Sequence, residues 1–253
     1  MKRTWRIIGL FFGVFLVSGS ISVSKSAGQT NEKVAPFVLE TELYSFDDPR
    51  HPEPGGVLAL RRIDARRSDG SFVLVEIRNG VAARGVRYRD GTFVTIVDDL
   101  RKKSTGRAVP PQQMAFFWNG VLRPPANCVL AKDEVWAGSA TAYGLQLMIV
   151  KQEPSRAANK ITSWRTPELG CKNLTYLVET KRGDGSWARV TEQRVVTLKL
   201  GEPPPKLFDN GSDYTELKPS VLNRMLLERE GIVADEEILK RDDELVDRDY
   251  PKK

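Results

Sequence analysis

The sequence WRTPELGCKNLTYLVETKRGDGSWARVTEQRVVTLKLGEPPPKLF, at residues 164–208, has the pattern of a β-hairpin. Its residues 174–180 alternate apolar and polar side chains, as a strand with one buried face does. The run KRGDGS at 181–186 supplies residues that tolerate a tight reversal, and residues 187–200 return as a second strand rich in Val, Thr and Leu. Three prolines at 203–205 lack amide hydrogens, so the second strand must end before them.

The turn of this hairpin has two counterparts earlier in the chain. An Asp-Gly pair followed by a hydroxyl residue and an aromatic residue occurs at 69–72, 90–93 and 184–187. Strand-like sequence follows each one, which is typical of a meander with common Asp-Gly turns. A duplicated ancestral unit would give the same pattern. Both interpretations predict an antiparallel sheet.

Further strands for this sheet are expected over most of the chain. They lie at residues 37–43, 57–65, 72–78, 81–88, 93–97 and 140–150. Asn79-Gly80 is a favoured hairpin turn between two of them. The predicted fold class is mainly β and α+β overall. It is a curved antiparallel sheet or half-barrel, built as a meander of Asp-Gly hairpins, with a C-terminal helix.

One amphipathic helix is predicted at residues 220–230. Ser220 would cap its N-terminus and Gly231 would end it. Its apolar side, which we expect to pack on the sheet, contains Val221, Leu222, Met225 and Leu226. Residues 235–246 have a weaker helical pattern, and their charge density fits a disordered tail equally well.

The chain divides into three parts: an export signal at 1–26, an antiparallel β domain at 27–217, and the helix with an acidic tail at 218–253. Basic residues, then an apolar run at 7–17 and small residues, have the order of an export signal. The eleven-residue run is shorter than the roughly 20 residues of a membrane helix. We therefore expect cleavage near Ala27 rather than retention as an anchor, and no stable membrane span afterwards.

Export would place the mature chain in the periplasm or outside a bacterial cell. The formal net charge of +6 falls to +2 without residues 1–26, which contain four basic and no acidic residues. This weak charge and the exported location both argue against nucleic acid as a partner.

The chain contains two cysteines, Cys128 and Cys171. An even pair in an exported protein is typical of a structural disulfide. The single histidine, His51, lies in a proline-rich loop, where surface exposure is usual, and it excludes a multi-histidine zinc site. No nucleophile motif or Gly-rich phosphate loop is present. We therefore predict no catalytic residue, no metal and no cofactor.

The densest aromatic cluster lies at residues 114–118. Phe116, Phe117 and Trp118 are consecutive, so on a strand they would point to both faces of the sheet. Unless both faces are covered, part of this surface stays open to an apolar or amphipathic ligand, with Trp136 nearby. The alternative is a second sheet layer, for instance residues 145–150 and 190–200, that buries the cluster and leaves no cavity.

Several segments of the chain resemble known proteins. They are RRSDGSF at 66–72, WRTPELGC at 164–171, and GEPPPKLF at 201–208 followed by Asp213-Tyr214. Together they resemble a family of uncharacterised bacterial exported β-rich proteins over most of the mature chain. The chain is more distantly similar to the half-barrel of periplasmic lipoprotein carriers. This resemblance implies a curved antiparallel sheet whose helices cover an apolar concavity, and it implies no activity.

Three classes of function fit the sequence. The leading one is an exported, non-enzymatic binding or interaction module that holds a lipid or another apolar or amphipathic ligand in its curved sheet. The second is a structural component of the bacterial envelope, with a filled core and an envelope protein as partner. The third is a hydrolytic enzyme, which requires carboxylates such as Asp98, Asp99 and Glu168 to converge. Charges at strand ends are more often solvated.

Overall fold

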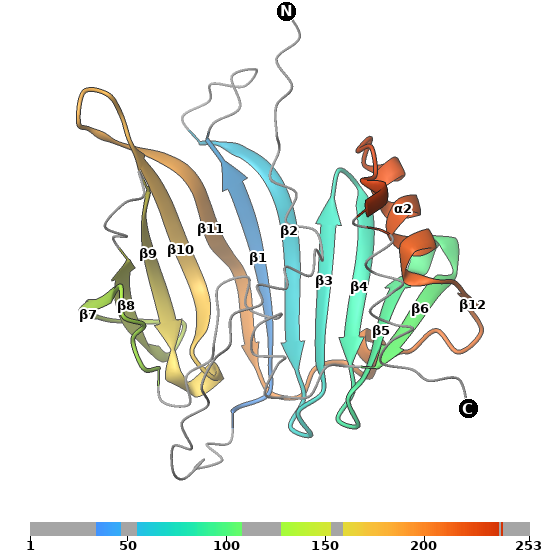
Figure 1. Cartoon of the computed structure of the whole chain (residues 1–253). Helices are drawn as coiled ribbons and strands as arrows, with labels where there is room; N and C mark the ends of the chain where they lie inside the picture. The colour runs from blue at the N-terminus through green and yellow to red at the C-terminus, as the bar shows by residue number, and fades with distance from the viewer. Residues whose placement is uncertain (1–33, 47–54, 108–127, 153–158, 238, 240–253) are drawn as a thin grey trace, which may run out of the picture.

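The computed structural model describes residues 34–46, 55–107, 128–152, 159–237 and 239. Within these ranges the chain forms a curved, unclosed twelve-stranded sheet and one α-helix of eleven residues (Figure 1). The strands are β1 (Phe37–Ser45), β2 (Val57–Arg66), β3 (Phe72–Arg78), β4 (Val81–Arg87), β5 (Thr92–Val97), β6 (Lys102–Arg107), β7 (Glu134–Ala142), β8 (Leu145–Gln152), β9 (Asn159–Thr166), β10 (Lys172–Lys181), β11 (Trp187–Leu200) and β12 (Thr215–Glu216). The helices are η1 (Asp98–Leu100), η2 (Pro167–Leu169), η3 (Pro205–Phe208) and α2 (Pro219–Arg229).

The strands follow the order β12-β6-β5-β4-β3-β2-β1-β11-β10-β9-β8-β7. Neighbouring strands are antiparallel, except that β12 runs parallel to β6. The predicted curved, mainly β fold is confirmed, with this one correction at the edge. The chain therefore makes two meanders that meet where β1 pairs with β11, from Phe37 opposite Leu200 to Ser45 opposite Thr191.

The three Asp-Gly turns have the same hydrogen bonds, as their common sequence predicts. In the turn between β10 and β11, Arg182 N donates to Ser186 O at 2.8 Å and Gly185 N donates to Arg182 O at 3.0 Å. Asp184 Oδ1 accepts from Ser186 N at 2.9 Å. The glycine has a φ of 85°, which a residue with a Cβ rarely adopts. Matching bonds close the turns at 67–71 and 88–92.

Some strands differ from the sequence predictions. Residues 140–150 are not one strand, because Tyr143 and Gly144, with φ angles of 56° and 75°, form a tight turn between β7 and β8. The strands β6 and β9 were not expected, since KKSTGR and the start of NKITSWRT have few apolar residues. Residues 145–150 and 190–200 do not make a second layer, because β8 and β11 belong to the same sheet.

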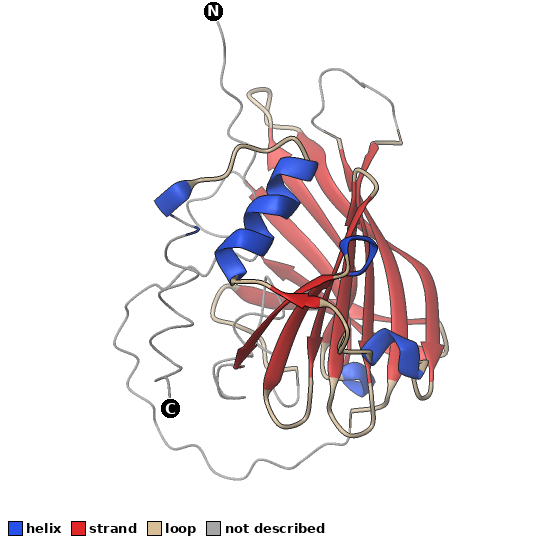
Figure 2. Cartoon of the chain, turned by 90° about the vertical axis from the view of Figure 1, so that its right-hand side faces the viewer, coloured by secondary structure: helices blue, strands red, loops and turns tan. Residues whose placement is uncertain are grey.

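The helix α2 packs on one face of the sheet, over β4 and β6 (Figure 2). Ile96 and Val97 are consecutive in β5 and therefore point to opposite faces. Leu222 and Leu226 of α2 pack against Val97, whereas Phe208 of η3 packs in the cluster that contains Ile96. We call the side of Val97 the helix face.

The predicted helix is confirmed in place but not in detail. Its N-cap position is Lys218 with Pro219 as the first residue, so Ser220 lies inside the helix and is not the cap. Val221 is 42% exposed, because the side that contacts the sheet is narrower than the predicted apolar side. Gly231, with a φ of 73°, follows the helix end as expected.

Replacement of Leu222 should measure how firmly α2 is packed. Leu222 is 0% exposed, so Leu222→Ala should lower the free energy of unfolding by about 3 kcal/mol through lost burial and a cavity. Val221→Ala is the matched control and should change it by less than about 0.5 kcal/mol. Urea denaturation of both variants measures the difference. Equal effects would show that the α2 contact does not stabilise the fold.

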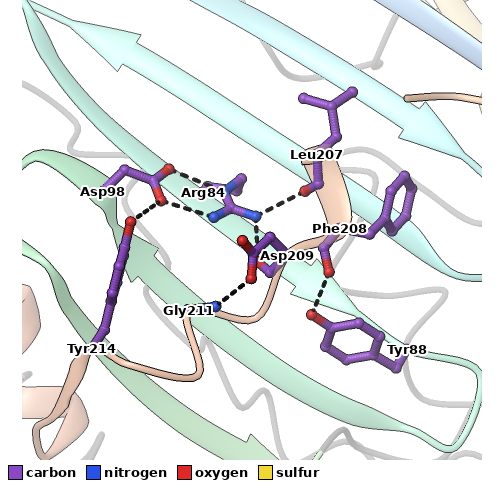
Figure 3. Close-up of polar contacts among 8 residues, drawn as sticks. All are labelled: Arg84, Tyr88, Asp98, Leu207, Phe208, Asp209, Gly211 and Tyr214. Carbon is purple, nitrogen blue, oxygen red and sulfur yellow. Dashed lines mark hydrogen bonds and ion pairs between the residues drawn. The ribbon is translucent and has the colours of Figure 1, made fainter. Parts of the chain in front are cut away.

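The segment after β11 is fastened to the opposite face by the Arg84 side chain (Figure 3). Arg84 Nη1 donates to the carbonyl oxygens of Leu207 at 2.9 Å and Asp209 at 2.5 Å. Its Nε and Nη2 donate to the carboxylate of Asp98 at 3.1 and 2.8 Å. The Arg84 side chain is 7% exposed and that of Asp98 is 52% exposed. We call these contacts the Arg84 clasp.

A disulfide joins Cys128 and Cys171, as the sequence predicts, with Cα atoms 5.4 Å apart. It connects the segment before β7 to the start of β10, where Cys171 N donates to Thr166 O at 2.9 Å. In the described ranges, no helix is long and apolar enough to cross a membrane. The predicted export signal and the acidic tail beyond residue 239 lie outside these ranges, and residues 236–237 and 239 are helical.

Candidate functional site

The helix face is the concave side of the sheet. In the strand pairing, Thr95 lies opposite Gly85, Gly85 opposite Leu74, and Leu74 opposite Asp64, so Asp64 shares the face of Val97. Lys172 Nζ of β10 lies 3.0 Å from Asp64 Oδ1 of β2. Two strands, β1 and β11, separate them in the sheet. Their backbones would be about 14 Å apart in a flat sheet, so the ion pair bridges a sheet that bends toward this face.

An apolar cluster fills the part of the concave face near β1, β8 and β10. It consists of Phe37, Leu39, Leu145, Leu147, Leu169 and Leu174, all 5% exposed or less. Phe72 and Trp164 pack against it. This part of the interior is filled, as expected for a structural core.

A charged region lies beside this cluster on β2 and β3. Arg62 pairs with Glu76, and Lys172 pairs with Asp64. Burial alone would lower the pKa of Arg62, but the charges of Glu76 and Asp64 hold that pKa above its ordinary value. Burial raises the pKa of the nearby Tyr176 hydroxyl. Within each of these ion pairs, the positive and the negative charge on the concave face compensate each other.

Arg66 and Arg87 differ from these pairs. Arg66 of β2 and Arg87 of β4 both lie opposite Phe72 of β3 in the strand pairing. The three side chains therefore share the concave face. Burial lowers the pKa of both guanidinium groups, and the charge of Arg87 lowers that of Arg66 further. Arg66 Nε is buried without a hydrogen-bond partner. No acidic partner for either arginine occurs among the described residues.

The sequence of β2 contains a signal for this charged region. Arg62 and Asp64 of the predicted strand at 57–65 alternate with Arg66, one residue beyond its predicted end, so the three fall on one face of β2. Alternating charges in a strand of a mainly β protein usually indicate the solvent face. Here they face the concavity, because Ala65 on the other side is 0% exposed and belongs to the core under η3.

The carboxylates considered for an enzyme do not converge. Asp98 binds Arg84 in the clasp, and Asp99 binds Arg229 of α2, whose hydrogen bond lowers the pKa of Asp99. Glu168 accepts a hydrogen bond from the Thr166 hydroxyl at 2.5 Å. It lies in η2, which precedes β10, and five strands separate β10 from β5, the strand that η1 follows. In the described part of the chain, no group of three or more His, Cys, Asp or Glu residues could hold a metal.

Of the predicted ligand-binding residues, only Trp136 lies in the described ranges. Phe116, Phe117 and Trp118 lie outside them. Trp136 belongs to β7, the last strand of the sheet, and is 62% exposed. The adjacent Val135 is 58% exposed. The structure therefore brings Trp136 to an accessible edge and not into the apolar cluster.

An open groove of about 490 Å³ lies where the first Asp-Gly turn meets the triproline segment. It is lined by Arg67, Ser68, Asp69, Glu202 and residues 203–205. The groove lies between two chain segments, which are joined by a hydrogen bond from Ser68 N to Glu202 Oε1 at 3.0 Å.

No protein-family model and no curated protein matches this chain. Among solved structures, an uncharacterized conserved protein from Thermus thermophilus is 8% identical, with a TM-score of 0.39 over 73% of this chain and 90% of that one. PNGF-II is 12% identical, with a TM-score of 0.40 over 77% of this chain, which spans only 33% of the PNGF-II chain.

A putative outer membrane lipoprotein-sorting protein domain from Vibrio parahaemolyticus is 11% identical, with a TM-score of 0.27 over 70% of this chain and 90% of that one. A lipoprotein-sorting domain is thus among the matched structures. The resemblance to a family of exported proteins has no match of its own. These likenesses carry no argument about function.

Proposed function

We propose that this protein is an exported, non-enzymatic binding module that holds an amphipathic ligand on the concave face of its sheet. The observation that carries the proposal is the pair Arg66 and Arg87 beside an apolar cluster. A purely structural interior would pair its buried charges, as Arg62 and Lys172 are paired here.

The exported location is part of the same proposal. The order of basic, apolar and small residues at 1–26 supports an export signal, and the Cys128–Cys171 disulfide suits an oxidising compartment. Residues 27–217 would form the binding domain. Residues 218–253 would provide α2, which covers part of the concave face, and an acidic tail.

We further propose that Phe116, Phe117 and Trp118 contribute apolar contacts to the ligand. Trp136 lies opposite Val150, on the face away from Leu147, so it would contact only a part of the ligand that extends past the edge strand β7. A buried aromatic contact contributes roughly 1.5–3 kcal/mol to binding by the usual area estimate.

Titration of the mature chain with dodecanoate below micelle formation, followed by tryptophan fluorescence, tests this function. We expect a saturable change in the wild type and about tenfold weaker binding in Trp118→Ala. Trp187→Phe is the control, because Trp187 stacks with Lys160 at the tip of the β10–β11 hairpin. The absence of a saturable change in the wild type, or an unchanged affinity in Trp118→Ala, would rule out this function at this site.

A structural role in the envelope is the second candidate. The edge strand β7 exposes Val135 and Trp136, which fits strand pairing with an envelope protein. The titration separates the two functions, because a purely structural component would not bind dodecanoate saturably.

A further inference from the structure

We infer that Arg66 and Arg87 form a binding site for the anionic group, a carboxylate or a phosphate, of the amphipathic ligand. This inference rests on the proposed function and specifies the chemical class of its ligand. It gives a role to Arg66, the first residue of the RRSDGSF segment, and to Arg87, to neither of which the sequence patterns or the comparisons assign one.

The strand register brings the two arginines to the same ring. Arg66 and Arg87 lie opposite Phe72 from its two neighbouring strands. Lys172 Nζ lies 5.8 Å from the centre of the Phe72 ring. Three cations therefore lie near this ring, and only Lys172 has an acidic partner, Asp64, in the part of the chain that the structure describes.

Other arginines of the sheet have carboxylate partners. Arg165 pairs with Glu134 at 2.5 Å, with side chains 11% and 8% exposed. Arg62 pairs with Glu76 on the same concave face as Arg66. The described residues thus pair buried guanidinium groups as a rule, and Arg66 and Arg87 depart from it. Since none of the described residues supplies this partner, we infer that an anionic ligand does.

Two partly buried positive charges in proximity destabilise a fold. Each loses hydration, and each repels the other, as the lowered pKa of Arg66 beside Arg87 indicates. An anion would satisfy both groups. The planar fork of guanidinium donors binds two oxygens of a carboxylate or phosphate at once, which lysine cannot do.

The neighbourhood also accommodates the apolar part of such a ligand. Phe72, which lies between the two arginines in the register, packs against the apolar cluster of Phe37 and Leu39. The cluster itself is buried, so a ligand with its anionic group at Arg66 and Arg87 would place its chain against the partly exposed ring of Phe72. The two halves of the site match the two halves of an amphipathic anion.

Calorimetric titration of the mature chain with four probes tests the inference. The probes are dodecanoate, dodecyl phosphate, the neutral dodecyl maltoside and inorganic phosphate. The variants are Arg66→Gln, Arg87→Gln and the double variant, with Arg89→Gln as the matched control because Arg89 is exposed in a turn. We expect each substitution at the site to weaken binding of the two anionic amphiphiles by about tenfold, with dodecyl maltoside and the control unchanged.

The outcomes separate this inference from the proposed function. If all three amphiphiles bind equally and the variants change nothing, the anion site is wrong and the binding module stands. If inorganic phosphate binds through the two arginines and no amphiphile binds, the anion site stands and the proposed function fails. Preference for dodecanoate or dodecyl phosphate identifies which anion the site accepts. If none of the probes binds, both are overturned.

Thermal unfolding of the same variants distinguishes a binding role from a structural one. Removal of one of two repelling charges should leave the Tm of Arg66→Gln unchanged or higher than that of the wild type. A Tm lowered by more than about 5 °C would show that Arg66 stabilises the fold and would overturn the inference.

Discussion

Cys171→Ser should lower the free energy of unfolding by about 4 kcal/mol and the Tm by about 10 °C. The bond spans a sequence separation of 43, and opening it restores the conformational freedom of that loop to the unfolded chain. Domains of this size have net stabilities of about 5–15 kcal/mol, so this would be a large fraction of the total.

Chemical denaturation of the oxidised wild type and of Cys171→Ser measures this effect. Cys128→Ser and the double variant are matched controls and should give the same loss, because each removes the same bond. Reduction of the wild type with dithiothreitol should reproduce it. A reduced wild type that is as stable as the oxidised one would show that the disulfide does not stabilise the fold.

Removal of the Arg84 clasp should have a comparable effect, with Arg84→Met lowering the free energy of unfolding by about 3–4 kcal/mol. The substitution would leave the carbonyl oxygens of Leu207 and Asp209 without their donor. The ion pair with Asp98 should contribute less, because the Asp98 side chain is 52% exposed and solvent screens it.

Denaturation in low and high salt separates these contributions. If the carbonyl bonds dominate, about 1 M NaCl should leave most of the difference between wild type and Arg84→Met in place. Arg89→Met is the control and should change stability by less than about 0.5 kcal/mol. A loss below about 1 kcal/mol in Arg84→Met would show that packing of Phe208 alone holds the segment on the sheet.

The parts of the fold that the sequence predicted are those with local chemistry. Asp184-Gly185 and Asn79-Gly80 specify their turns through backbone angles that few other residues adopt, and alternating side chains specify the strands beside them. The strand β6 was missed because its residues KKSTGR do not alternate. The place of β6 depends on its pairing with β5. The rest of the fold, and not the residues of β6, determines this pairing.

The candidate site could be predicted only in part for the same reason. Arg66 and Arg87 lie 21 positions apart, and nothing in their local sequence indicates that they share a neighbour. Their proximity follows from the register of three strands, and their burial follows from the curvature of the sheet. Register and curvature depend on contacts between distant segments, which the pattern within each strand does not record.

The pairing of β1 with β11 has a consequence for how the protein folds. Residues 37–107 and 134–200 each pair mainly within themselves, through hairpins that close in microseconds. The two halves meet along one long-range junction, where Phe37 pairs with Leu200. Contacts of such separation close slowly, because much chain entropy is lost before they form. During synthesis from the N-terminus, β1 would therefore be exposed along one edge until β11 is made.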